Sequence, residues 1–211
     1  MAPGQTAHGP RFDESISHAP LAMSRITGAA LVSVDGVDAA AVKAAAKRLL
    51  STRSPRGRSG ISQWGASGLF DELAIAGDSA GIPSARTLLL LYASDLAFRL
   101  RWQIEPALAE GQLVVAAPYV DTAVAFGRAA GLPAGWLASL FRFAASPTSR
   151  CYVEEPPVRS PQPLPGFIEL GCARLAGRHL GLSSQQLASR TRAHLNAAAV
   201  RRGRSAFHAG Q

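Results

Sequence analysis

One short stretch of the chain has the order of elements with which many proteins bind phosphate. An apolar run from Ala29 to Val34 is typical of a buried strand, and Asp35-Gly36-Val37-Asp38 is typical of a turn. Strong helix formers follow from Ala39. The free N–H groups and the dipole at the start of a helix attract anions. The candidate phosphate-site residues are therefore Asp35, Gly36, Asp38 and Lys43.

The residues that would complete such a site are missing. A phosphate cradle needs glycines, so that backbone N–H groups can approach the phosphate, and a lysine that neutralises its charge. This chain has Ala41 and Val42 at the start of the helix instead. Asp35 and Asp38 fit a turn and a helix N-cap at least as well as a binding role. Both interpretations stay open from the residues alone.

Composition limits the classes of protein that the chain can be. Its 211 residues are 47% hydrophobic, which suits one globular domain with a sizeable core. The net charge of +8 favours polyanions, but the basic residues are scattered along the sequence, so solvated basic faces are favoured over a nucleic-acid partner. Cys151 and Cys172 lack metal-ligand spacing, so we expect no metal site and a reducing compartment. No apolar run has the length of a membrane span, and we expect a cytoplasmic protein.

The order of the patterns predicts an α/β fold with an open, mostly parallel sheet. Residues 1–23 are predicted to be a disordered arm, 24–200 a single domain and 201–211 a frayed basic tail. Continuous apolar runs predict strands over 26–34 and 113–117, and a third strand is predicted over 149–155. Helices are predicted over 39–50, 85–111, 122–130, 133–145, 167–180 and 183–200.

The second of these helices has clear signals at both ends. Ser84 is a good N-cap, and Pro106 should kink or restart the helix before Gly111 ends it. Residues 88–93 are apolar all round, which predicts a buried start for this helix. Arg99 is expected to be solvated or ion-paired.

Two stretches resemble one family. VDGVDAAAVKA, residues 34–44, is similar to the P-loop of nucleoside monophosphate kinases, and of thymidylate kinase in particular. Residues 88–126, which contain LLLLYASD, IEPALAEG and a strand ending in a tyrosine, resemble the thymidylate kinase segment with LLF-A-A-D-R, I-x-PALA-x-G, D-R-Y and S-x-x-A-Y. The resemblance implies a P-loop NTPase-like three-layer sandwich with about four to five strands, and a possible homodimer. A last apolar strand after residue 180 is not evident, so the sheet is expected to be one strand short.

Transferred residue by residue, the resemblance places a degenerate P-loop (Walker A) here. Gly36 matches the first P-loop glycine, and Asp38 matches the aspartate that approaches the substrate sugar. The second glycine falls on Ala41, the phosphate lysine on Val42 and the magnesium-binding Ser/Thr on Lys43. Lys43 is one position late, which is about 100° around a helix, so it should not reach the same point.

The rest of the family's site is also incomplete. The Asp-Arg of D-R-Y falls on Ala117 and Pro118, and the phosphate-gripping arginine falls on Leu96. The resemblance implies that the substrate-pocket candidates are Tyr92, Tyr119, Thr122 and Phe126. Tyr92 and Phe126 are more typical of core aromatics than of a base-stacking slot.

These departures lead to three hypotheses. We expect a catalytically inactive thymidylate kinase-like protein, a pseudokinase without catalytic residues, that keeps a nucleotide-binding or protein-interaction role. The alternative is an active kinase of dTMP and ATP that needs Mg²⁺ and uses rewired phosphate contacts from Lys43, Lys47, Arg48 or residues 53–58. The third is a polyanion-binding module that uses the basic loop 51–60 and the tail 201–211.

Overall fold

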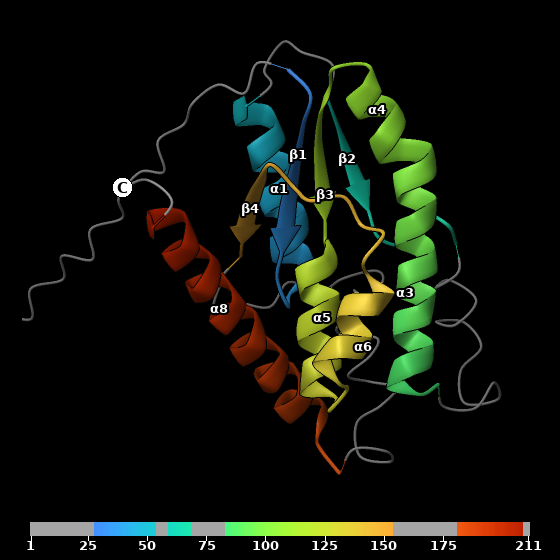
Figure 1. Ribbon diagram of the computed structural model, residues 1–211, viewed down its shortest axis with the longest axis vertical. Coiled ribbons are helices and arrows are strands. Elements are labelled where there is room, and N and C mark those ends of the chain that lie inside the picture. Colours follow the sequence, from blue (N-terminus) through green and yellow to red (C-terminus); the bar gives the residue numbers. More distant parts are fainter. Residues whose placement is uncertain (1–27, 54–58, 69–82, 154–180, 209–211) are drawn as a thin grey trace, which may run out of the picture.

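Four parallel strands form one sheet in the part of the chain that the structure describes, residues 28–53, 59–68, 83–153 and 181–208 of a computed structural model. The strands lie in the order β2-β3-β1-β4 (Figure 1). All residues of the two central strands are buried, which explains their nearly continuous apolar sequences. The strands are β1 (Ala30–Asp35), β2 (Ser59–Gln63), β3 (Leu113–Ala117) and β4 (Ser149–Tyr152).

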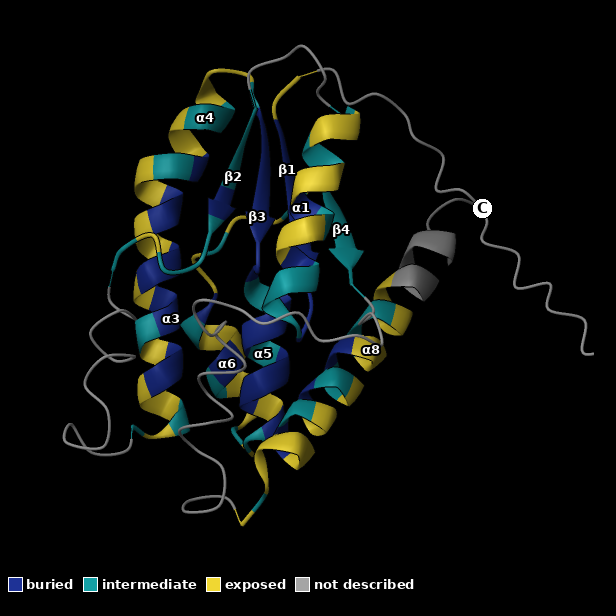
Figure 2. Cartoon of the chain, turned by 180° about the vertical axis from the view of Figure 1, so that it is seen from behind, coloured by how far each residue is buried: buried dark blue, intermediate teal, exposed yellow. Residues whose placement is uncertain are grey.

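Helices cover both faces of this sheet and make three layers (Figures 1 and 2). Helix α1 (Ala39–Arg53) packs through Val42 and Ala46 on the face that carries Val32 and Val34. The other face, which carries Leu31, packs against the second cluster of buried side chains. This division follows from the alternation of side chains along β1. The helices on that second face are α3 (Ala85–Arg99), α5 (Val120–Ala129), α6 (Ala134–Leu140) and α8 (Ser184–His208). The predicted α/β, P-loop NTPase-like architecture is confirmed.

The long helix begins and ends where its sequence signals predict. The Ser84 hydroxyl accepts a hydrogen bond from the N–H of Thr87, and Gly111 adopts a φ of +77° after the helix ends. Pro106 lacks an N–H, and the chain reaches it through a π-helical turn, η2 (Leu100–Ile104), before α4 (Glu105–Ala109). The predicted all-round burial of its start is wrong at Leu90, which is 51% exposed, because only one side of α3 faces the sheet.

Several other boundaries differ from the prediction. Strand β2 was not predicted, because its sequence SGISQ contains a single large apolar residue, Ile61. Helix α6 ends at Leu140 rather than at residue 145, and α8 continues to His208, through residues that we expected to fray. The packing of α8 against α5 and β4 supports this long helix.

Some predictions lie outside the described residues, namely the arm 1–23, residues 54–58 of the basic loop, the Pro-rich run 156–166 and the helix 167–180. Within the described ranges the sheet has four strands, and β4 is the edge strand next to β1. A search of the same ranges finds no helix that could cross a membrane.

Candidate functional site

The carboxyl ends of β1 and β3 meet around the side chain of Asp35, which is fully buried. Its Oδ1 accepts three hydrogen bonds, from the N–H of Tyr119 at 3.0 Å, the N–H of Thr122 at 2.9 Å and the Thr122 hydroxyl at 2.8 Å. Its Oδ2 is buried without a hydrogen-bond partner among the described residues. Burial, and secondly the nearby Asp121 carboxylate, raise the pKa of Asp35 to about 6. Asp35 therefore links β1 to the start of α5 at the carboxyl end of the sheet, where parallel α/β folds bind ligands.

The turn after β1 is short and closely packed. The N–H of Gly36 donates to the Thr122 hydroxyl at 3.1 Å. A Cβ on Gly36 would lie 2.7 Å from Cγ2 of Val42 and 3.3 Å from Cβ of Val153. Gly36 is thus required by close contact with the first turn of α1, and the Val42 side chain fills the space beneath it.

Asp38 caps helix α1. Its Oδ1 accepts a hydrogen bond from the N–H of Ala41 at 2.7 Å, and its carbonyl accepts one from Val42 at 3.0 Å. The positions that match the glycine and lysine of a P-loop therefore lie inside a regular helical turn. The N–H of Ala41, which could face a phosphate, is already bound to the protein's own carboxylate. Lys43 follows on the exposed side of α1.

The substrate-pocket candidates lie in the hydrophobic core. Tyr92 and Phe126 are fully buried, and Tyr119 is 1% exposed. The Tyr92 hydroxyl donates to the carbonyl of Tyr119, and the Tyr119 hydroxyl donates to the carbonyl of Ala145, each at 2.8 Å. Burial raises the pKa of Tyr119 to about 12 and also raises the pKa of Tyr92, so both phenols stay neutral. The ring of Tyr92 meets Phe141 edge to face.

A buried ion pair lies beside these tyrosines. Arg99 donates from Nε to Oδ2 of Asp95 at 3.0 Å and from Nη1 to the carbonyl of Pro118 at 3.1 Å, and both side chains are fully buried. Asp95 Oδ1 also accepts from the N–H and the hydroxyl of Ser67. The guanidinium lies 5.8 Å from the centre of the Tyr92 ring. Of the two predicted states of Arg99, the ion-paired one is confirmed. The spacing of four residues between Asp95 and Arg99 is the sequence signal from which this ion pair could have been predicted, because residues four apart face each other on a helix.

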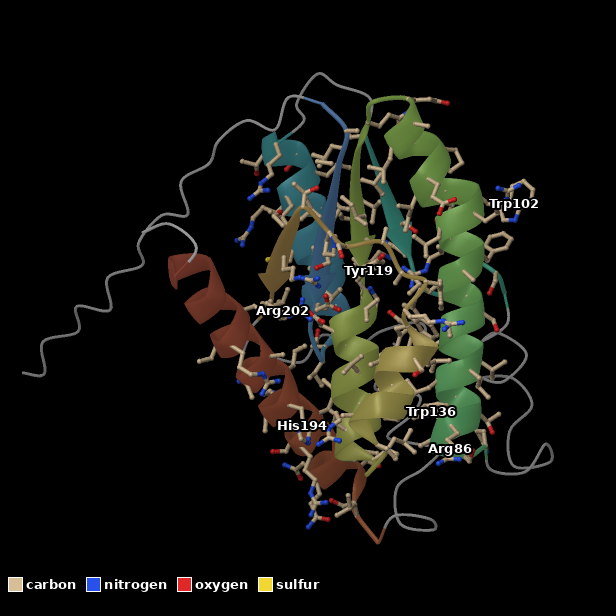
Figure 3. All side chains as sticks on the ribbon, in the orientation of Figure 1. Arg86, Trp102, Tyr119, Trp136, His194 and Arg202 are labelled. Atoms are coloured by element: carbon tan, nitrogen blue, oxygen red, sulfur yellow. The ribbon has the colours of Figure 1, made fainter. Side chains whose placement is uncertain are left out.

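A second charged cluster joins α5, β4 and α8. Asp121, which is 5% exposed, accepts from the Tyr152 hydroxyl at 2.7 Å. It also pairs with Arg150 at 3.3 Å and with Arg202 at 2.8 Å. Figure 3 shows Arg202 reaching from α8 toward the carboxyl end of the sheet. No local sequence pattern predicts this cluster, because its members come from three elements that are far apart in the chain.

The structure thus brings together Asp35, Gly36, Asp38, Tyr119 and Thr122, and Tyr92 joins them through Tyr119. Lys43 lies on the outside of α1 and Phe126 lies in the core, so neither joins this group. In the described ranges no three His, Cys, Asp or Glu side chains gather in a way that could hold a metal ion. The arrangement is a hydrogen-bonded core with a closed turn.

Comparison with known proteins supports the fold. No protein-family model matches the chain, and no curated protein matches its sequence. The structure is similar to the crystal structure of thymidylate kinase from Ehrlichia chaffeensis, with a TM-score of 0.62 and 12% sequence identity, over 82% of each chain. At this identity the likeness concerns the fold alone. The expected resemblance is confirmed at that level: the chain has a thymidylate kinase-like fold.

Proposed function

We propose that this chain is a thymidylate kinase-like protein that has lost phosphoryl transfer and keeps its fold for binding. One observation carries the proposal, namely the closed start of α1. The Asp38 carboxylate binds the N–H of Ala41, and the Val42 side chain packs against Gly36. A phosphate at this helix end would have to displace the carboxylate of Asp38, which is also negatively charged.

The chemistry of phosphoryl transfer makes this loss severe. Catalysis of this reaction consists mainly of positioning the phosphates and neutralising their charge. Removing a single donor that stabilises the transition state typically costs about 3 kcal/mol of barrier. Here Ala41, Val42, Leu96 and Ala117 stand where the resemblance implies a glycine, a lysine, an arginine and an aspartate.

A direct assay tests the proposal. Purified chain is incubated with ATP, dTMP and Mg²⁺, and dTDP formation is measured beside Lys43→Met and the matched variant Lys47→Met, which changes the same residue type one turn further along α1. We expect no turnover in any of the three. Turnover by the wild type that disappears in Lys43→Met and survives in Lys47→Met would establish the active, rewired kinase and refute the proposal.

Nucleotide binding is a separate question from turnover. A ligand that binds only the folded state stabilises it by RT ln(1 + [L]/Kd), which is about 2.7 kcal/mol at one hundred times Kd. Thermal unfolding with ATP, dTMP and dTDP, each with and without Mg²⁺, therefore measures whether a nucleotide role remains. Stabilisation without turnover supports a binding role, and no stabilisation leaves a protein partner as the favoured role.

A second copy of the chain is the protein partner that we propose. Leu90, Phe98 and Trp102 are 51%, 39% and 67% exposed, and with Ser94 they form one outward stripe on α3 and η2. Figure 3 shows Trp102 pointing away from the body of the fold. If two such helices cross antiparallel at the centre of the stripe, Leu90 of each meets Trp102 of the other and Phe98 meets the small Ser94. Sedimentation equilibrium should show a dimer that Trp102→Glu converts to a monomer; a monomeric wild type would disprove the pairing.

A further inference from the structure

Basic side chains of α1, β4 and α8 lie on both faces of the edge strand β4. Arg53, at the end of α1, donates to the Ser149 hydroxyl of β4 at 3.3 Å. Burial raises the pKa of the Cys151 thiol in β4, and Arg48 and Arg53 are the nearby cations that oppose this rise. On the other face of β4, Arg150 and Arg202 share Asp121. We use the name basic side for the basic residues of α1 alone, which are Lys43, Lys47, Arg48 and Arg53.

Little negative charge opposes this basic side. The sequences of α1, β4 and α8 contain no Asp or Glu. The described carboxylates nearby are Asp121, which is shared by two arginines, Asp38, which caps α1, and Asp35, which is fully buried. Three residues, Lys43, Lys47 and Arg48, lie on the exposed face of α1, which stands in front of the sheet in Figure 2. A surface with this imbalance attracts polyanions and raises their rate of encounter.

The other exposed side chains of this surface indicate which kind of polyanion it could bind: a duplex, a single strand or a membrane. The exposed residues of α1 are Lys, Arg, Ala, Ser and Thr, which can contact phosphates but offer no aromatic ring for stacking on unpaired bases. The large exposed aromatics of the described chain, Phe98, Trp102 and Phe143, belong to other elements. A membrane surface would need apolar side chains to insert, and Val200 is the single large exposed one in the described parts of α1, β4 and α8.

We propose that the basic side of the fold binds the phosphate backbone of double-stranded nucleic acid without sequence preference. Lys43 and Lys47 lie one helical turn apart, about 6 Å along α1, and present two charges along one line. Arg48 lies about 100° around α1 from Lys47, and Arg48 and Arg53 are the basic residues of α1 that approach β4. This surface does not use the closed turn at Asp35, so the proposal is independent of whether the chain binds nucleotides.

The test measures affinity as a function of salt. Fluorescence anisotropy follows binding of a labelled duplex DNA, a duplex RNA and a single strand of the same sequence between about 50 and 200 mM NaCl. Contact with about six phosphates predicts a slope of log K against log salt of about −5, and thus about a thousandfold loss of affinity over this range. A duplex of scrambled sequence should bind equally, and comparison of the DNA and RNA duplexes identifies the source of the backbone.

Two matched pairs of substitutions locate the surface. Lys43→Gln/Lys47→Gln removes two charges from α1 and should make the slope for duplex DNA shallower by about 1.8. Arg101→Gln/Arg142→Gln removes the same charge from exposed positions on other elements and should leave the slope unchanged. Glutamine is almost as good a helix former as lysine or arginine, and circular dichroism checks that all variants are folded.

Four results would overturn the proposal. These are no binding at about 50 mM salt, a salt-independent affinity, tighter binding of the single strand than of the duplex, and an equal loss in both pairs of variants. Equal loss would mean that the net charge of the whole chain, rather than this surface, attracts the duplex. A fifth result that would overturn it is binding of phosphatidylserine vesicles by a chain that does not bind the duplex.

Discussion

The buried carboxyl of Asp35 should make the free energy of unfolding depend on pH. Its pKa rises from an ordinary 3.8 to about 6 in the folded protein, because burial and Asp121 disfavour the ionised form. Below the lower value both states are protonated and the contribution to stability is fully present. As the pH rises from the lower value through the higher one, the unfolded chain ionises while the folded protein keeps its carboxyl protonated, so stability is lost across this window and the loss levels off above it. Two pKa units correspond to about 3 kcal/mol.

Asp35→Asn removes this dependence while it keeps the hydrogen bonds. The amide oxygen can still accept from Tyr119 and Thr122, and the amide nitrogen replaces Oδ2, which has no partner among the described residues. The asparagine side chain does not ionise, so its contribution to stability does not depend on pH. Its stability relative to the wild type should therefore increase by about 3 kcal/mol between pH 4 and pH 7.5.

Urea denaturation at intervals across this pH range measures the difference. Glu110→Gln, a substitution of the same kind at an exposed site, is the matched control and should follow the wild type. If Asp35→Asn keeps the pH slope of the wild type, the buried carboxyl is not its origin and the account of this site is wrong.

Three further substitutions test the packing around the site. Gly36→Ala should destabilise by about 1–3 kcal/mol, since its Cβ would lie 2.7 Å from Val42, and Val42→Ala should restore part of the loss in thermal unfolding. Arg99→Met should cost about 3–5 kcal/mol, because it leaves Asp95 buried without its ion pair; adding Asp95→Asn should recover much of this in urea denaturation, and no recovery would contradict the pairing. Asp38→Ala should cost about 1 kcal/mol through loss of the cap on α1, and an unchanged midpoint would show that the cap is not formed in solution.

Much of the fold could be predicted because its main elements carry local signals. The strands β1 and β3 are apolar runs, and Ser84 caps α3 as its side chain and position indicate. Strand β2 carries no such signal, because an edge strand with the sequence SGISQ forms only where β3 is available to pair with it. Its register opposite β3 depends on a partner more than forty residues further along the chain.

The candidate site was only partly predictable. The residues Asp35, Gly36 and Asp38 are predicted to form the turn after the first strand, and the cap at Asp38 is one of the two interpretations of that turn. The buried pair of Asp95 and Arg99 and the cluster around Asp121 were not assigned, because burial decides whether a charged side chain is solvated or paired, and burial is not written in local sequence.

The sequence by itself determined that α1 starts at Ala39 without the glycines and lysine of a phosphate cradle, since residue types and spacing are enough for that conclusion. Tertiary structure alone decided which side chains fill the turn after β1. Thr122, from the start of α5, binds both Asp35 and Gly36, while Val42 fills the space beneath the turn. Tertiary structure also placed basic residues that are distant in the chain around β4. Contacts between residues far apart in sequence depend on how the layers pack, and no local pattern records that packing.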